Sequence, residues 1–151
     1  AGDGKMKTRH FLKALDDERI AEAIRRAENR TSGEIRVFIS SRRMPGKPVL
    51  ERAAAQFAKS GMAATLEHNG VLIYLVPEIQ QFAIFGDAGI HGKCGDGFWS
   101  EIAEGLRSKM KAGDFSASII EAVSAIGEAL ATYFPKRPDD RNELPDTVGS
   151  D

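Results

Sequence analysis

The sequence is poor in three features that mark whole classes of protein: cysteine, net charge and long apolar runs. Its single cysteine, Cys94, excludes an internal disulfide framework and a metal site built from cysteine alone. Lys and Arg number 21 against 22 Asp and Glu, so the net charge of −1 argues against nucleic acid as a partner. No uninterrupted apolar run approaches the about 20 residues that cross a bilayer, and residues 1–7 lack the apolar segment of a signal peptide. We therefore expect a cytoplasmic protein without a membrane span.

The length and the spacing of apolar residues predict one domain that contains both helices and strands. The 151 residues suit a single domain, and 42% apolar with 28% charged residues is a globular composition. Apolar spacing predicts helices at about 16–30, 48–60, 98–111 and 116–134 and strands at about 34–40, 71–76 and 80–85. We expect residues 1–14 to form an arm or a short helix, 15–134 the domain, and 135–151 an extended tail.

The connections between these elements predict how the strands are arranged. The order α-β-α-β-β-α-α contains a strand–helix–strand unit, which implies a parallel pair of strands with a right-handed crossover. The short link at Pro77-Glu78 implies that the third strand turns back antiparallel to the second. We therefore expect an α/β fold, a Rossmann-like α/β/α sandwich around a small mixed sheet.

This topology brings four oxygen-bearing side chains to one end of the sheet. The first two strands begin there and the third ends there, next to Glu34, Asn69, Asp87 and Asp96. Carboxylate and amide oxygens suit a hard cation, Ca²⁺ or alternatively Mg²⁺. A simpler interpretation stays open, in which Asn69 forms a turn, Asp96 caps the helix of Trp99 and Glu34 only flanks a strand.

The segment from Gly86 to Gly97 is rich in glycine and is expected to be a loop. Asp87 lies between Gly86 and Gly89, where backbone can approach a ligand closely, so these two glycines are candidate ligand-binding residues and Asp87 a candidate catalytic residue. The segment matches neither a Walker A motif nor the dinucleotide-binding fingerprint. A tight irregular loop without an anion is the alternative.

Other chemistries find little support in the sequence. His91 and Cys94 are three residues apart, but a zinc site needs further nitrogen or sulfur ligands, and the other two histidines are remote in sequence. Cys94 as a nucleophile lacks a marked base and orienting group other than His91.

An ordered set of short motifs resembles the TPM domain family. The motifs are Thr31-Ser32-Gly33-Glu34-Ile35-Arg36-Val37, Gly61-Met62 with Thr65, Asn69-Gly70-Val71-Leu72-Ile73 and Gly86-Asp87-Ala88-Gly89-Ile90. The similarity extends over roughly residues 15–134, and the ending Phe134-Pro135 with Asn142-Glu143-Leu144-Pro145 resembles a stand-alone bacterial branch. The family takes its name from a plant thylakoid-lumen protein of photosystem II repair, its cyanobacterial relative and a nematode receptor-accessory protein.

The resemblance implies an α/β/α sandwich, Ca²⁺ binding, and an acid-phosphatase activity proposed for the plant branch. Glu34 and Asp87 fall within the matching motifs and Asp96 follows them, whereas the acidic pair of the plant branch has no clear match between Gly92 and Trp99. Many family members carry a signal peptide and a membrane segment.

Three hypotheses about function follow, from different classes. The first is a Ca²⁺-binding accessory domain that assists the maintenance of membrane proteins, with a membrane protein or membrane-protein complex as its partner. The second is a protein-interaction module with an exposed apolar patch around Phe11 and Leu12 or on the tail. The third is a metal-assisted phosphomonoesterase in which Asp87 holds the metal or attacks phosphorus.

Overall fold

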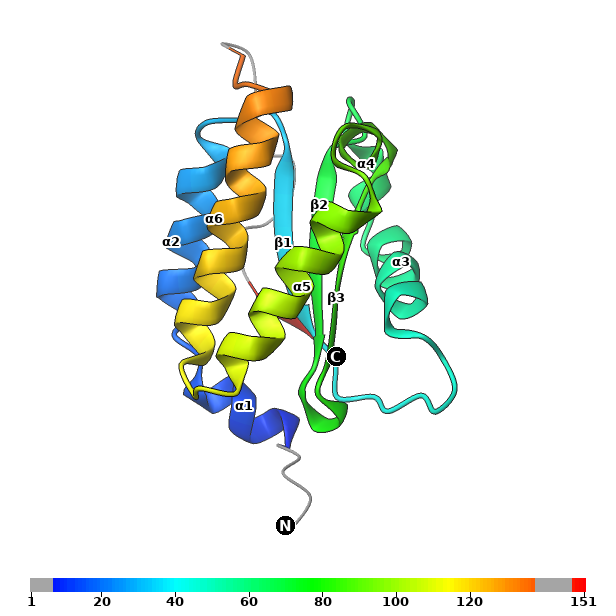
Figure 1. Ribbon diagram of the computed structural model, residues 1–151, viewed down its shortest axis with the longest axis vertical. Coiled ribbons are helices and arrows are strands. Elements are labelled where there is room, and N and C mark those ends of the chain that lie inside the picture. Colours follow the sequence, from blue (N-terminus) through cyan, green and yellow to red (C-terminus); the bar gives the residue numbers. More distant parts are fainter. Residues whose placement is uncertain (1–6, 138–147) are drawn as a thin grey trace.

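The protein is built around a four-stranded mixed sheet with helices on both faces (Figure 1). The computed structural model describes residues 7–137 and 148–151. The strand order is β3-β2-β1-β4, with β1 at Glu34–Ile39, β2 at Gly70–Val76, β3 at Gln81–Gly86 and β4 at Gly149–Ser150. The predicted α/β/α sandwich with a small mixed sheet is therefore confirmed.

The pairing of the strands follows the predicted chain directions. β1 runs parallel to β2, and β2 runs antiparallel to β3 through the short η2 turn at Pro77–Ile79. β4 was not predicted: residues 149–150 were expected in an extended tail, but they pair in parallel with Phe38 and Ile39 at the free edge of β1. The rest of the predicted tail lies partly outside the described residues.

One face of the sheet is covered by α2 (Asp17–Glu28), α5 (Asp96–Met110) and α6 (Phe115–Tyr133). Figure 1 shows α2 and α6 side by side, with α5 crossing the strands beside them. The alternating residues Ile35, Val37 and Ile39 of β1 all belong to this core, as the period of two in their sequence predicts. α6 is long and apolar enough to cross a membrane, but its apolar residues pack in this core.

The other face is covered by α3 (Val49–Lys59) and the short η1 helix (Met62–Ala64). In this core the rings of Phe38 and Tyr74 stack on each other, and Phe57 of α3 packs against Phe85 of β3. Within α3, Arg52 is buried although it is charged, whereas the apolar residue Ala58 is exposed. A second, smaller hydrophobic core therefore lies between α3 and the sheet.

Two helices differ from the sequence-based expectations. The glycine-rich segment that was predicted as a loop contains α4 (Ala88–Cys94), which Asp87 caps by accepting a hydrogen bond from the backbone N–H of Ala88 at 2.8 Å. The turn at Gly95, with φ at 79°, separates α4 from α5, so Asp96 is the first helical residue of α5 and not its N-cap as predicted.

The N-terminal segment forms a helix that packs on the domain. α1 spans Thr8–Ala14, and the ring centroids of Phe11 and Phe115 lie 4.9 Å apart. Phe11 is only 2% exposed, so the predicted apolar surface patch around Phe11 and Leu12 is wrong: Phe11 is part of the core.

Candidate functional site

Glu34 and Asp87 lie in one row across the sheet, on either side of Gly70. Glu34 pairs with Gly70 in the parallel ladder. In the antiparallel ladder Val71 pairs with Gly86, and the backbone N–H of Asp87 donates to the carbonyl of Gly70 at 2.9 Å. Two strand spacings separate the two acidic residues, which corresponds to roughly 10 Å between their Cα atoms. The chain directions thus bring two residues 53 positions apart in the sequence to one end of the sheet.

Both acidic residues belong to the side of the sheet that faces α3. Residues of one row point to the same face of a sheet, and a Cβ on Gly70 would lie 3.3 Å from the ring of Phe57 and from the carbonyl oxygen of Met62. Phe57 and Met62 belong to the α3 layer. The two carboxylates therefore share a face as well as an end of the sheet.

Glu34 is almost completely buried, with 2% of its surface exposed, and its backbone N–H donates to the carbonyl of Asn69 at 3.4 Å. A second buried carboxylate, Glu28 at the end of α2, accepts a hydrogen bond from the backbone N–H of Ile35 at 2.8 Å. Glu28 could not be predicted as a site residue, because a glutamate in the last turn of an amphipathic helix carries no distinguishing signal in the sequence. This end of β1 thus holds two carboxylates away from solvent.

The two oxygens of Asp87 have different surroundings. Oδ1 accepts the capping hydrogen bond from Ala88. Oδ2 is buried, accepts no hydrogen bond from the described residues, and lies 3.4 Å from Nδ1 of His68. His68, with φ at 52°, precedes the Asn69-Gly70 turn. It was not expected at a zinc site because it is remote in sequence from His91 and Cys94. Its proximity to Asp87 depends on the register between β2 and β3, and this register could not be predicted from the sequence.

Asn69 is buried and ties the start of β2 to the segment before β1. Its side-chain Nδ2 donates to Oγ of Ser32 at 3.1 Å, and its backbone N–H donates to Oγ1 of Thr65 at 3.3 Å. These bonds agree with the simpler interpretation of Asn69 as a turn residue. They also hold its side chain at the same end of the sheet as Glu34 and Asp87.

Asp96 has a different contact. Its side chain is 96% exposed, and Oδ1 lies 3.1 Å from Nε2 of His91. Nδ1 of the same imidazole accepts a hydrogen bond from Nε1 of Trp99 at 3.0 Å, so Nε2 carries the proton of the neutral ring. Within 7–137 and 148–151 no group of three His, Cys, Asp or Glu side chains is arranged to hold a metal ion.

At the two candidate ligand-binding glycines, other protein atoms fill the space in which a Cβ would lie. A Cβ on Gly86 would lie 2.3 Å from Cζ2 of Trp99, and a Cβ on Gly89 would lie 2.2 Å from the carbonyl oxygen of Glu67. The backbone N–H of Gly89 donates to the carbonyl of His68 at 2.8 Å. Both glycines therefore allow close packing of α5 and of the 67–68 turn, and this packing positions Asp87.

Cys94 lacks the features of an activated nucleophile. Partial burial raises the pKa of its thiol, which lowers the fraction of reactive thiolate at neutral pH. The imidazole of His91 is already engaged by Trp99 and Asp96. The structure therefore provides no described base for Cys94.

Comparison with known proteins agrees with this architecture. The family model of the TPM domain matches residues 6–129. The structure is similar to the NMR structure of BA42 protein from the psychrophilic bacterium Bizionia argentinensis sp. nov., with a TM-score of 0.80 and 37% sequence identity over 91% of this chain and 95% of that chain. The search of curated proteins gives no match. The chain belongs to the TPM domain family.

Proposed function

We propose that the protein is a divalent-cation-binding accessory domain, with Ca²⁺ as the preferred ion and Mg²⁺ as the alternative. The observation that supports the proposal most directly is the row in which Glu34 and Asp87 flank Gly70 on one face of the sheet. Asn69 is held at the same end by its bond to Ser32. Hard cations of this kind bind to carboxylate and carbonyl oxygens.

A cation would relieve an electrostatic cost in the structure as it stands. Carboxylates that are withdrawn from water and share one face of a sheet repel each other. Glu34 is buried, and Oδ2 of Asp87 is buried at 3.4 Å from Nδ1 of His68. A bound Ca²⁺ would place positive charge between the two carboxylates and reduce this repulsion. Because two carboxylates give fewer ligands than the six to eight oxygens that Ca²⁺ takes, water would complete the shell and we expect millimolar to submillimolar affinity.

A Ca²⁺ titration followed by backbone amide NMR tests this proposal. We expect amides near Gly33, Gly70 and Gly86 to shift, and the shifts to disappear in Asp87→Asn. The matched control is Asp114→Asn, because Asp114 caps α6 as Asp87 caps α4 and asparagine caps a helix as well as aspartate does. Asp96→Asn shows whether this exposed residue contributes. Unchanged amides in this region at millimolar Ca²⁺ would overturn the proposal.

The role in the maintenance of membrane proteins is proposed from family membership. Its test is co-sedimentation of the purified chain with detergent-solubilised membrane proteins in Ca²⁺ or in a chelator. We expect binding that requires Ca²⁺ and is lost in Asp87→Asn. Equal binding in Ca²⁺ and in chelator would separate any partner from the cation site and contradict the link between them.

A phosphomonoesterase is the second candidate, and the contact between His68 and Asp87 is the feature that favours it. A histidine beside a carboxylate offers a proton donor for a leaving group. Residues 88–94 form a helix, so this segment does not provide the backbone amides of an irregular glycine-rich loop. Hydrolysis of an aryl phosphate that is abolished by both His68→Gln and Asp87→Asn would favour this candidate, whereas activity that survives Asp87→Asn would exclude this site.

A further inference from the structure

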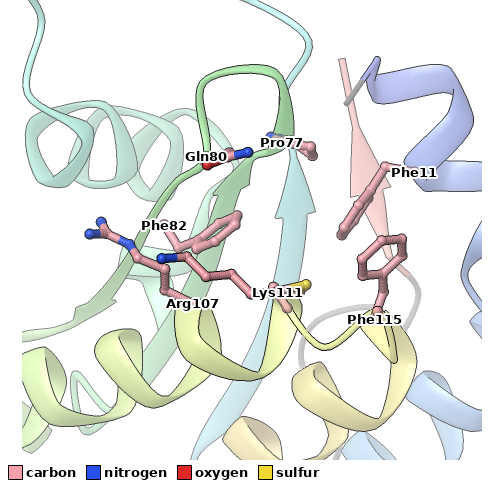
Figure 2. A pocket seen from close by; sticks show the side chains of 9 residues that line it. Phe11, Pro77, Gln80, Phe82, Arg107, Lys111 and Phe115 are labelled. Atoms are coloured by element: carbon pink, nitrogen blue, oxygen red, sulfur yellow. The ribbon is translucent and has the colours of Figure 1, made fainter. Parts of the chain in front are cut away.

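A cavity of about 390 Å³ lies between α1, the η2 turn, β3 and the end of α5, at the opposite end of the sheet from Asp87 (Figure 2). Pro77 at its edge follows the last residue of β2, whereas Gly70 beside Asp87 is the first residue of that strand. The strand between them is roughly 20 Å long. The cavity is therefore separate from the proposed cation site.

The interior of this cavity is aromatic. Phe11 of α1 and Phe115 of α6 form one wall, with Phe82 of β3 on the other side (Figure 2). Met110 adds a flexible thioether to the lining. The volume is within the range of about 300–1,000 Å³ that is usual for small-molecule sites, which are mostly apolar with a few polar groups. The lining favours a ligand with an apolar body.

The charged groups of the cavity are both cationic. Arg107 and Lys111 line it from one side, one helical turn apart along α5 and its C-cap. Neither forms an ion pair with an acidic side chain in the part of the chain that the structure describes, whereas Lys109 on the same helix pairs with Glu121. The nearby acidic residue Asp114 accepts from the backbone N–H of Ala117 at the start of α6.

The position of Arg107 is not explained by the helix alone. Basic residues in the last turn of a helix interact favourably with its dipole, but this effect applies to exposed side chains as well. Nε of Arg107 is buried and has no hydrogen-bond acceptor among the residues that the structure describes. Two like charges one turn apart also repel each other. An anion in the cavity would remove both costs.

We propose that this cavity binds an amphipathic monoanion, a short apolar chain or ring that carries one carboxylate. The apolar body would lie against Phe11, Phe82 and Phe115, and the carboxylate would lie at the rim between Arg107 and Lys111. This site goes beyond the proposed cation-binding function and does not depend on it.

Three probes with the same eight-carbon body test the proposal: octanoate, octan-1-ol and octylammonium. Each is titrated into the ¹⁵N-labelled full chain in a buffer with chelator, so that the cation site plays no part. We expect octanoate to shift the amides of Phe82, Gly113 and Phe115, octan-1-ol to shift them at higher concentration, and octylammonium to leave them unchanged. Equal dissociation constants for octanoate and octan-1-ol, or no shifts with octanoate at millimolar concentration, would overturn the proposal.

Rim variants give the second arm of the experiment. Arg107→Gln and Lys111→Gln should each weaken octanoate binding about tenfold, which corresponds to about 1.4 kcal/mol, and leave octan-1-ol binding unchanged. The control is Lys59→Gln, an exposed residue of α3 on the other face of the sheet. Thermal unfolding without ligand shows whether each variant folds, and we expect Arg107→Gln to unfold no earlier than the parent chain. Octanoate binding that survives both rim variants would contradict the proposal.

Discussion

The indole ring of Trp99 occupies the space in which a side chain on Gly86 would begin. A Cβ on Gly86 would lie 2.3 Å from Cζ2 and 2.9 Å from Cε2 and Cη2 of this ring. Trp99 is also anchored by its hydrogen bond to Nδ1 of His91. The end of β3 can therefore approach α5 this closely only with glycine at position 86, and Asp87 follows directly from that contact.

Gly86→Ala should lower the free energy of unfolding by about 1–3 kcal/mol, because a methyl group forced against a packed ring displaces it. Denaturant unfolding measures the loss, and the fluorescence of Trp99, the only tryptophan, reports the displacement of the ring. Gly105→Ala is the matched control, because Gly105 lies in α5 and no atom of another described element lies within 4 Å of its Cβ position. It should stabilise the chain by about 0.5–1 kcal/mol. Equal stability of the two variants would contradict the proposed contact.

The strands and their directions could be predicted because burial leaves a direct pattern in the sequence. β1 alternates, and Ile35 and Val37 face one core while Phe38 faces the other. β2 is apolar throughout, and all seven of its residues are buried, as expected for a central strand covered on both faces. These two patterns, with the short link at Pro77, were enough to predict that Glu34 and Asp87 lie at the same end of the sheet.

The remaining features depend on tertiary contacts that have no local signal. Glycine lowers helix propensity, so Gly89 and Gly92 argued for a loop, but the cap at Asp87 and the complete burial of Ile90 stabilise α4. The two residues of β4 have little strand propensity and pair because the edge of β1 is available. The contact between His68 and Asp87 likewise requires the register of two strands.

Gly89→Ala is expected to disturb the candidate cation site. Its Cβ would lie 2.2 Å from the carbonyl oxygen of Glu67 and 2.6 Å from that of His68, so the turn before β2 or the start of α4 must move. We expect a loss of about 1–3 kcal/mol in the free energy of unfolding, together with shifted amides around Asp87. Thermal unfolding and an NMR spectrum measure both effects.

Gly92→Ala serves as the control for this prediction within the same helix. Outside the backbone of its own helix, no described atom lies within 4 Å of its Cβ position, so alanine should raise the stability of α4 by about 0.5–1 kcal/mol. The amides around Asp87 should stay where they are. If Gly89→Ala also stabilises the chain, the turn at Glu67 and His68 does not pack against Gly89 as closely as the structure shows.

Arg52 is 3% exposed and links α3 to the loop after β1. Its Nη2 donates to the carbonyl of Arg42 at 2.6 Å and to Oγ of Ser40 at 3.2 Å, and its guanidinium lies 5.5 Å from the ring centroid of Tyr74. Lysine keeps the charge but cannot reproduce the planar fork or its stacking.

We therefore expect Arg52→Lys to lower the free energy of unfolding by about 1–3 kcal/mol, since buried acceptors lose their donor. Urea unfolding measures this change. Arg26→Lys, at a side chain that is 80% exposed, should change stability by less than about 0.5 kcal/mol. If both variants unfold at the same urea concentration as the parent chain, the guanidinium of Arg52 contributes only its charge.

Asp151 holds β4 against β1 in a way that depends on pH. Its carboxylate accepts hydrogen bonds from Oγ of Ser40 at 2.7 Å and from the backbone N–H of Ser41 at 2.8 Å. Partial burial alone would raise the pKa of Asp151, but the bonds from Ser41 and Ser40 and the nearby Arg42 keep this pKa below its ordinary value. A carboxyl group with a lowered pKa in the folded state stabilises the fold above its unfolded pKa of about 3.9, and this contribution is lost as the pH falls through the lowered pKa.

Asp151→Asn should therefore reduce the free energy of unfolding by about 1 kcal/mol at pH 7, because the charge-assisted hydrogen bonds are replaced by weaker ones. The difference from the parent chain should begin to shrink below about pH 4, where the unfolded chain takes up the proton, and should be lost as the pH falls through the lowered pKa of the folded carboxyl group. Urea unfolding at a series of pH values measures both quantities, with Glu104→Gln on the exposed side of α5 as the control. A difference that stays constant from pH 7 to pH 3 would show that Asp151 acts through its shape and not through its charge.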